Sequence, residues 1–249
     1  MHTDLSLSRR ALLRLGAGVA ASLAPAVAFG ATPRQMKGPY YPNPDQLALR
    51  PGAFRDNDLT RVPGIDRDAL GAPMLITGTV SDASGRPVPG AVVEIWQACE
   101  SGRYLAARDK RRSRAHDAGF QYFGVCVADR DGRYTFRTIR PPAYPSGVLP
   151  GWVRPPHIHV KVRAPGMADF ITQLYWEDPS DPLREEHARL QRRDLIIGGV
   201  PVRRRDLLIR PVTLRRPAQV SLVSHSACPF EAPRQLDFPI SLTQDLYVP

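Results

Sequence analysis

Short apolar runs, several of them alternating with polar residues, follow one another along most of the chain. Alternation with a period of two is typical of a half-buried β-strand, because successive side chains of a strand point to opposite faces. Clusters of Gly, Pro and Asp separate the runs and favour turns. The pattern therefore predicts strands over residues 73–82, 90–98, 121–129, 132–139, 157–163 and 169–176, with further short strands within 204–224 and 236–242.

The dipeptide Asp131-Gly132 lies between two of these runs. Asp-Gly between strand-like segments is a strong signal for a tight hairpin turn. We therefore expect residues 121–129 and 132–139 to form a hairpin.

One stretch has the pattern of a helix, DPLREEHARLQRR at residues 181–193. Asp181 can cap its N-terminus and Pro182 suits the first helical position. Glu185 and Glu186 favour the positive end of the helix dipole. We expect this to be the single clear helix of the chain.

Residues 33–72 are rich in Pro and Asp and predict an irregular arm without regular structure. The chain contains 26 prolines, and its predicted strands are short and separated by Pro and Gly. These features favour an all-β fold over a helical or doubly wound one. We predict a β-sandwich with an irregular N-terminal arm and one short helix, forming a single domain over residues 31–249.

The first 30 residues have the features of a targeting segment. Arg9 and Arg10 precede an apolar stretch, residues 12–28, that is too short and too weakly hydrophobic for a membrane span. The run SRRALL resembles the twin-arginine export signal. We expect residues 1–30 to be removed during export, with only transient contact with the export machinery, and the protein to be periplasmic or secreted. The alternative is an N-terminal helix with a chance arginine pair.

The chain carries a net charge of +10, with 34 Lys and Arg against 24 Asp and Glu. The basic residues occur in short clusters without a nucleic-acid-binding motif, so we interpret them as solvated surface that can attract anionic substrates, and we expect no nucleic-acid partner. The three cysteines, Cys99, Cys126 and Cys228, exclude a full disulfide framework. Two alternatives remain equally open: either two of the three cysteines form a disulfide, or all three are free thiols.

The segment WVRPPHIHVKV, residues 152–162, carries the clearest candidate chemistry. His157 and His159 are two positions apart on a predicted strand, so their side chains share a face and can reach one metal ion. Two ordinary histidines on a half-exposed strand are the alternative. A further alternative is a zinc or copper site that adds a third ligand such as His116.

Four blocks of the sequence together resemble the intradiol ring-cleavage dioxygenases, and within that family its protocatechuate-cleaving, iron-bearing subunits. The blocks are GTVSDASGRPVPGAVVEIWQACESGRY, DRDGRYTFRTIRPPAYP, WVRPPHIHVKV and FITQLYWEDPSDP, and the likeness spans about residues 36–182. The resemblance implies a β-sandwich that holds one non-haem Fe(III) ion through two tyrosines and two histidines.

Carried over position by position, the resemblance assigns six residues. The metal ligands would be Tyr104, Tyr144, His157 and His159, and the catalytic residues would be Arg154, Tyr144 and Gln173. It further implies that Tyr144 is the ligand that a catechol displaces, and that it takes a substrate proton. Arg154 would stabilise negative charge that develops on the ring, and Gln173 would assist by hydrogen bonding.

The implied reaction is cleavage of a catechol-type ring by O2 between its two hydroxyls, giving a cis,cis-muconate, with protocatechuate the most expected substrate. The chain departs from the family at Ser146-Gly147, where an aromatic residue and an arginine are frequent. This departure leaves the choice of catechol open, and the resemblance is compatible with a homo-oligomer or a hetero-oligomer. A different function class is a transthyretin-like or carboxypeptidase-regulatory-like binding module, which would explain residues 73–98 alone.

Overall fold

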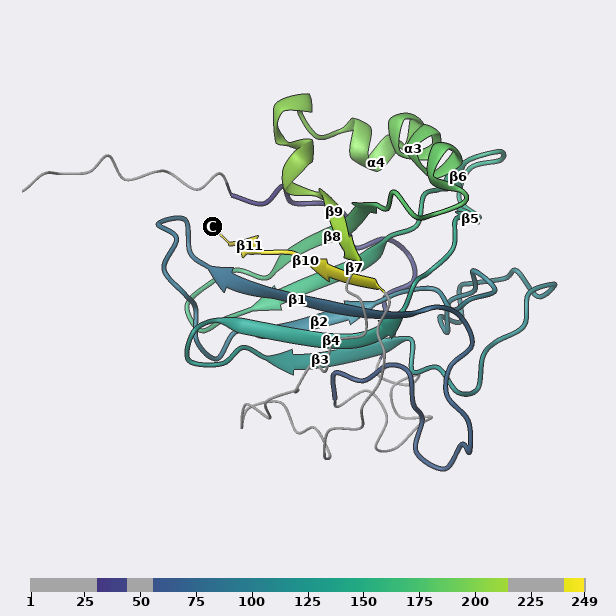
Figure 1. The fold of residues 1–249 in the computed structure, drawn as a ribbon, viewed down its shortest axis with the longest axis horizontal. Helices are drawn as coiled ribbons and strands as arrows, with labels where there is room; N and C mark the ends of the chain where they lie inside the picture. Colours follow the sequence, from purple (N-terminus) through teal and green to yellow (C-terminus); the bar gives the residue numbers. More distant parts are fainter. Residues whose placement is uncertain (1–30, 44–55, 215–239, 249) are drawn as a thin grey trace, which may run out of the picture.

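The computed structural model describes residues 31–43, 56–214 and 240–248, and most of its regular structure is β-strand (Figure 1). The strands are β1 (Pro73–Ser81), β2 (Val92–Trp96), β3 (Phe123–Val127), β4 (Arg133–Ile139), β5 (Tyr144–Pro145), β6 (Val153–Arg154), β7 (Ile158–Arg163), β8 (Phe170–Glu177), β9 (Ile209–Leu214), β10 (Ile240–Thr243) and β11 (Leu246–Tyr247). The helical elements of these ranges are α3 (Arg184–Arg193), α4 (Leu195–Gly198) and the 3-10 helix η1 (Val202–Leu207).

The strands form two layers that are joined at one side (Figure 1). One layer has the antiparallel order β3-β2-β7-β8. In the other, β1 lies between β4 on one edge and β10 and β11 on the other. Strand β9 pairs with both β8 and β10 and so connects the layers. The predicted all-β sandwich is confirmed.

Apolar side chains from both layers meet in one core between them. Along β4 the alternation places Tyr134 and Phe136 inside, and along β2 it places Val93 and Ile95 inside; none of the four is more than 2 % exposed. Burying such a side chain contributes about 1.5–3 kcal/mol relative to leaving it exposed. Alternation therefore marks the inward face of β4, whereas β2 is buried on both faces, with Glu94 and Trp96 at most 4 % exposed.

The turn at Asp131-Gly132 forms, but the predicted hairpin is wrong. Strand β3 pairs with β2, and β4 pairs with β1 in the other layer. The turn therefore carries the chain from one layer to the other. Gly132 has φ +73°, and a Cβ atom there would lie 2.6 Å from the Val80 carbonyl oxygen, so the turn depends on glycine.

The helical region also differs from the prediction. Helix α3 begins at Arg184, later than expected, and no side chain caps it. The Asp181 carboxylate instead accepts a hydrogen bond from the Leu183 N–H and pairs with Arg140 and His187. Glu185 lies in the first turn together with Glu186, as predicted. Helix α4 and η1 were not predicted, and η1 occupies the start of a region expected to be strand.

The described parts of the arm, residues 33–43 and 56–72, contain no helix or strand, as predicted, and the first part is attached to β8. The Gln35 N–H donates to the Ile171 carbonyl at 2.9 Å, and the Thr172 hydroxyl donates to the Pro33 carbonyl at 2.8 Å. The Gln173 side-chain amide donates to the Met36 carbonyl at 3.1 Å. The arm thus lies against the strand that carries one of the candidate catalytic residues.

Two other predictions concern the ends of the chain and its cysteines. The targeting segment and Cys228 lie outside the described residues, and no helix within the described ranges is long and apolar enough to cross a membrane. Cys99 is buried with a free thiol, whereas Cys126 is disulfide-bonded. The alternative of three free thiols is therefore wrong.

Candidate active site

Four side chains converge at one buried point: Tyr104, Tyr144, His157 and His159, here called the Tyr/His cluster. The Tyr144 hydroxyl lies 3.2 Å from the Tyr104 hydroxyl and 3.1 Å from His157 Nε2. The two imidazole centroids are 4.9 Å apart. None of the four residues is more than 3 % exposed.

The histidine pair is oriented by the start of β7. His157 Nδ1 lies 2.7 Å from the Pro155 carbonyl, so Nδ1 carries the proton that it donates there, and the Nε2 lone pair faces the Tyr144 hydroxyl. The His159 ring stacks on the Trp96 ring of the neighbouring strand β2, with centroids 4.7 Å apart and planes 7° apart. His159 Nδ1 is buried without a hydrogen-bond partner.

Tyr104 lies in the loop after β2 and is held from both sides of its backbone. Its N–H donates to Asp109 Oδ2 at 2.8 Å, and its carbonyl lies 3.0 Å from His116 Nε2. The Tyr40 ring stacks on the Tyr104 ring at 4.7 Å. His116 therefore contacts the Tyr104 backbone. Across the described ranges, no set of three His, Cys, Asp or Glu side chains is arranged to hold a metal ion, so the zinc or copper site with His116 as third ligand does not form.

Tyr144 lies on the short hairpin of β5 and β6, where it is directly opposite Arg154. Directly opposed residues of an antiparallel pair share a face, so this two-residue ladder places the guanidinium beside the Tyr/His cluster. Arg154 Nη2 donates to Gln173 Oε1 at 2.7 Å and to the Tyr175 hydroxyl at 3.0 Å. The structure thus brings all six predicted site residues together.

The Tyr/His cluster is neutral without a bound cation. Burial raises the pKa of Tyr144 to about 12 and, reinforced by the adjacent Tyr144 hydroxyl, raises the pKa of Tyr104 well above its ordinary value. Burial and the nearby Arg154 guanidinium lower the pKa values of His157 and His159 well below the ordinary value for histidine.

This donor set fits a ferric ion. Two imidazoles and two phenol oxygens converge in a water-poor site, and a highly charged, hard cation is what would stabilise phenolates there. Two phenolates would also offset most of the cation's charge, which makes burial of the ion less costly.

Sequence reasoning missed several residues that support these groups. The Arg111 guanidinium lies over the Tyr144 ring, 4.8 Å from its centroid, and donates to the Pro145 carbonyl at 3.1 Å. Asp194 Oδ2 accepts from Arg154 Nε at 2.7 Å. No motif marks Arg111, which lies in a basic cluster. Two signals were available for the others: Tyr175 is two positions from Gln173 on β8, and Asp194 precedes a short apolar run, as an N-cap does.

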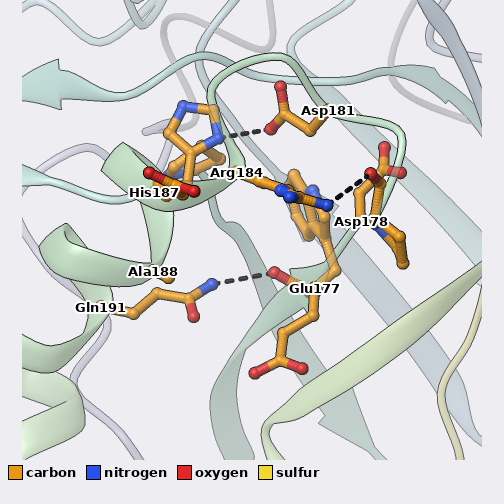
Figure 2. Close-up of a pocket in the computed structure, with 11 residues that line it drawn as sticks. Glu177, Asp178, Asp181, Arg184, His187, Ala188 and Gln191 are labelled. Atoms are coloured by element: carbon orange, nitrogen blue, oxygen red, sulfur yellow. Dashed lines mark hydrogen bonds and ion pairs between the residues drawn. The ribbon is translucent and has the colours of Figure 1, made fainter.

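A separate pocket of about 380 Å³ lies between α3 and the end of β8 (Figure 2). Figure 2 shows His187 beside Asp181 and the Gln191 side chain extending from α3. His187 Nδ1 lies 2.6 Å from Asp181 Oδ2, and Gln191 Nε2 donates to the Trp176 carbonyl at 2.9 Å. No member of the Tyr/His cluster lines this pocket. Its buried polar side chains, Asp178, Asp181 and Gln191, already have ion-pair or hydrogen-bond partners, so we do not place the chemistry there.

Comparisons with known proteins match a large part of the chain. A family model described as Dioxygenase matches residues 37–199. The protocatechuate 3,4-dioxygenase beta chain of Burkholderia cepacia is 40 % identical over 129 residues, which is 51 % of this chain and 54 % of the relative. A hydroxyquinol 1,2-dioxygenase of Rhizobium is 33 % identical over 147 residues, which is 53 % of this chain and 47 % of the relative. The chain thus spans about half the length of these curated relatives.

Solved structures share the fold. A catechol 1,2-dioxygenase from Acinetobacter, inhibited by bound mercury, aligns with a TM-score of 0.57 at 24 % identity, covering 88 % of this chain and 62 % of that one. The dioxygenase domain of a dioxygenase carbohydrate-binding protein fusion from Streptomyces aligns with a TM-score of 0.51 at 24 % identity, covering 88 % and 97 %. The family match extends far beyond residues 73–98, the only part that the binding-module alternative explains.

Proposed function

Because the chain belongs to the intradiol ring-cleavage dioxygenase family, we propose that it cleaves a catecholic substrate with O2 between the two hydroxyls and releases a cis,cis-muconate. The observation that carries the proposal is the convergence of two buried phenols and two buried imidazoles beside a buried arginine. Such a set has no evident structural purpose, since burying several polar side chains is costly even when they are hydrogen-bonded to one another, and His159 Nδ1 has no partner.

The Tyr/His cluster would hold Fe(III) through two phenolate oxygens and two imidazole nitrogens. When bound, the ferric ion would withdraw electron density from a chelated catechol and make a ring carbon reactive toward O2. The hydrogen bond from His157 Nδ1 to the Pro155 carbonyl fixes the tautomer that offers Nε2 as a donor atom.

The surroundings of the two tyrosines favour different roles for them. Tyr104 is anchored through both backbone polar groups and a stacked ring, whereas Tyr144 lies on a strand of only two residues. We assign Tyr104 as the permanent ligand and Tyr144 as the ligand that gives way to the incoming diol. Tyr144 would also be a base that accepts a proton from a substrate hydroxyl.

Arg154 and Gln173 would act on the substrate from one side. Arg154 bears a fixed positive charge beside the Tyr/His cluster, where it can stabilise negative charge that develops on the ring. The Gln173 carbonyl oxygen accepts from Arg154 Nη2, which leaves Gln173 oriented by the same hydrogen-bond network.

Protocatechuate is the substrate that we propose first. The relative that is 40 % identical bears that name, and a net charge of +10 favours an anionic ring over a neutral one. Other relatives are named for catechol, chlorocatechol and hydroxyquinol, substrates that lack the carboxylate of protocatechuate.

Steady-state turnover of a catechol panel tests the proposal. We expect purified protein to contain about one iron per chain, to be coloured by tyrosinate-to-iron charge transfer, and to consume O2 with at least one catechol. A colourless zinc protein, or iron-loaded protein that is inactive with protocatechuate, catechol, hydroxyquinol and chlorocatechol alike, would refute it.

A further inference from the structure

The Arg154 guanidinium has more hydrogen-bond partners than are needed to place a positive charge beside a substrate. Two of its three side-chain nitrogens are bonded: Nε donates to Asp194, and Nη2 donates to Gln173 and Tyr175. The Tyr175 hydroxyl in turn donates to Gln173 Oε1 at 2.9 Å, which closes the network. Only Nη1 is left without a hydrogen bond to the described residues, so the network fixes the plane of the guanidinium while leaving one edge open.

Asp194 is the only carboxylate that pairs with Arg154 in the described part of the chain, and it lies 40 positions away in sequence. Its side chain is fully buried, and the two oxygens have different partners. Oδ2 accepts from Arg154 Nε, while Oδ1 accepts from the Ile196 and Ile197 N–H groups at 3.0 Å each. One carboxylate therefore caps α4 and forms an ion pair with the charged arginine of the candidate site.

The segment that follows Asp194 packs under the same network. Ile197 of α4, Val200 and Leu208 form a small apolar cluster with Tyr175, whose ring is fully buried and whose hydroxyl contacts Arg154. The segment 194–208 thus touches the Arg154 network at two places, through the Asp194 carboxylate and through the Tyr175 ring.

We propose that Asp194 is a positioning residue, which holds the Arg154 guanidinium in the single orientation that presents Nη1 toward the substrate. The proposal rests on the function assigned to Arg154 above. On this proposal, the segment 194–208 serves to place the buried Asp194 carboxylate against Arg154, on the side away from the substrate. A purely structural role for Asp194, as a helix cap and half of a buried ion pair, is the competing explanation.

Substitution of Asp194 by serine separates the two roles. Serine is a good N-cap, so Asp194→Ser should keep α4 capped while removing the charge and the contact with Arg154. Asp194→Ala should lose both. Asp178 offers a matched control, because it is a buried carboxylate that pairs with Arg140 and accepts the Ser180 N–H beside the pocket of Figure 2.

The test is a double-mutant cycle on the iron-loaded protein. We expect Asp194→Ser to lower kcat/KM for the best catechol by about 10–100-fold, since small misplacement of a catalytic group is costly. It should also weaken binding of 4-hydroxybenzoate, which has one hydroxyl and cannot be cleaved between two. In an Arg154→Gln background the same substitution should change neither quantity further. Asp178→Ser should lower the Tm and leave both quantities unchanged.

Several outcomes would overturn the inference. Asp194→Ser with full activity would do so, as would an equal loss in the wild-type and Arg154→Gln backgrounds, or an equal loss for Asp178→Ser. If Asp194→Ser does not fold, the same double-mutant cycle is measured with Asp194→Asn, which keeps the helix cap and the side-chain volume. A wild-type protein that cleaves no catechol would instead refute the proposed function, so the two failures are distinguishable.

Discussion

At the scale of single residues, the two tyrosines of the cluster provide the sharpest prediction. Tyr104→Phe should reduce iron retention, because it removes a permanent ligand. Tyr144→Phe should retain iron but lower turnover by about 10²–10⁴-fold, since a base that takes a substrate proton is lost. The measurement is the iron content and the charge-transfer spectrum of each variant with and without bound catechol. If Tyr144→Phe changes the catechol-bound spectrum as much as the resting one, Tyr144 is not the ligand that leaves.

A second residue-scale prediction concerns pH. Burial raises the pKa of Asp56 above its ordinary value, against hydrogen bonds from the Asp58 N–H and the Gln121 amide that lower it. A carboxyl with a raised folded-state pKa favours the folded protein below its unfolded pKa, and that contribution is lost as pH rises through the folded pKa. Asp56→Asn keeps an acceptor without the charge, so its free energy of unfolding relative to wild type should be higher at pH 7 than at pH 4. Denaturant unfolding at both pH values measures this, and a difference of opposite sign would contradict it.

The single residues that could be predicted are those with a motif. The His-x-His spacing and the four matching blocks predicted six site residues, and the structure brings their side chains together. Asp194 and Arg111 lie outside the four blocks: the local sequence marks Asp194 only as a possible helix cap, and no motif marks Arg111. Their roles depend on which loops the tertiary fold places against β6 and β5, and the local sequence does not encode that.

At the scale of elements, glycine at the turn after β3 is the feature most open to test. Gly132 and Gly151 both have φ +73°, but a Cβ atom would meet the Val80 carbonyl at Gly132 and nothing within 4 Å at Gly151. Gly151→Ala should therefore cost about 1 kcal/mol from backbone strain alone, and Gly132→Ala clearly more. Chemical denaturation of both variants checks the order. Equal losses would mean that the contact with β1 is not what makes glycine necessary.

Elements were predicted well where periodicity was long and poorly where pairing was short or distant. The six principal strands lie where alternation predicted them, because alternation reports burial of one face. The hairpin at Asp131-Gly132 was wrong, because a turn motif reports local backbone shape and the partner strand is chosen by core packing. Strands β5 and β6 have two residues each and carry no periodic signal, yet they place Tyr144 opposite Arg154.

At the scale of the whole molecule, the sequence makes a prediction about location. We propose that the protein is exported through the twin-arginine route, because the run SRRALL precedes an apolar stretch. Arg9→Lys combined with Arg10→Lys should leave folded, iron-loaded protein in the cytoplasm. Cell fractionation with activity staining measures this, and unchanged export of the double variant would contradict it.

The central claim is intradiol cleavage, and incorporation of ¹⁸O₂ into the product tests it most directly. Turnover of the best catechol under ¹⁸O₂ should give a cis,cis-muconate that carries label in both newly formed carboxylates, one atom from each half of the O2 molecule. A product opened outside the two hydroxyls, or a muconate whose new oxygens come only from water, would contradict the account.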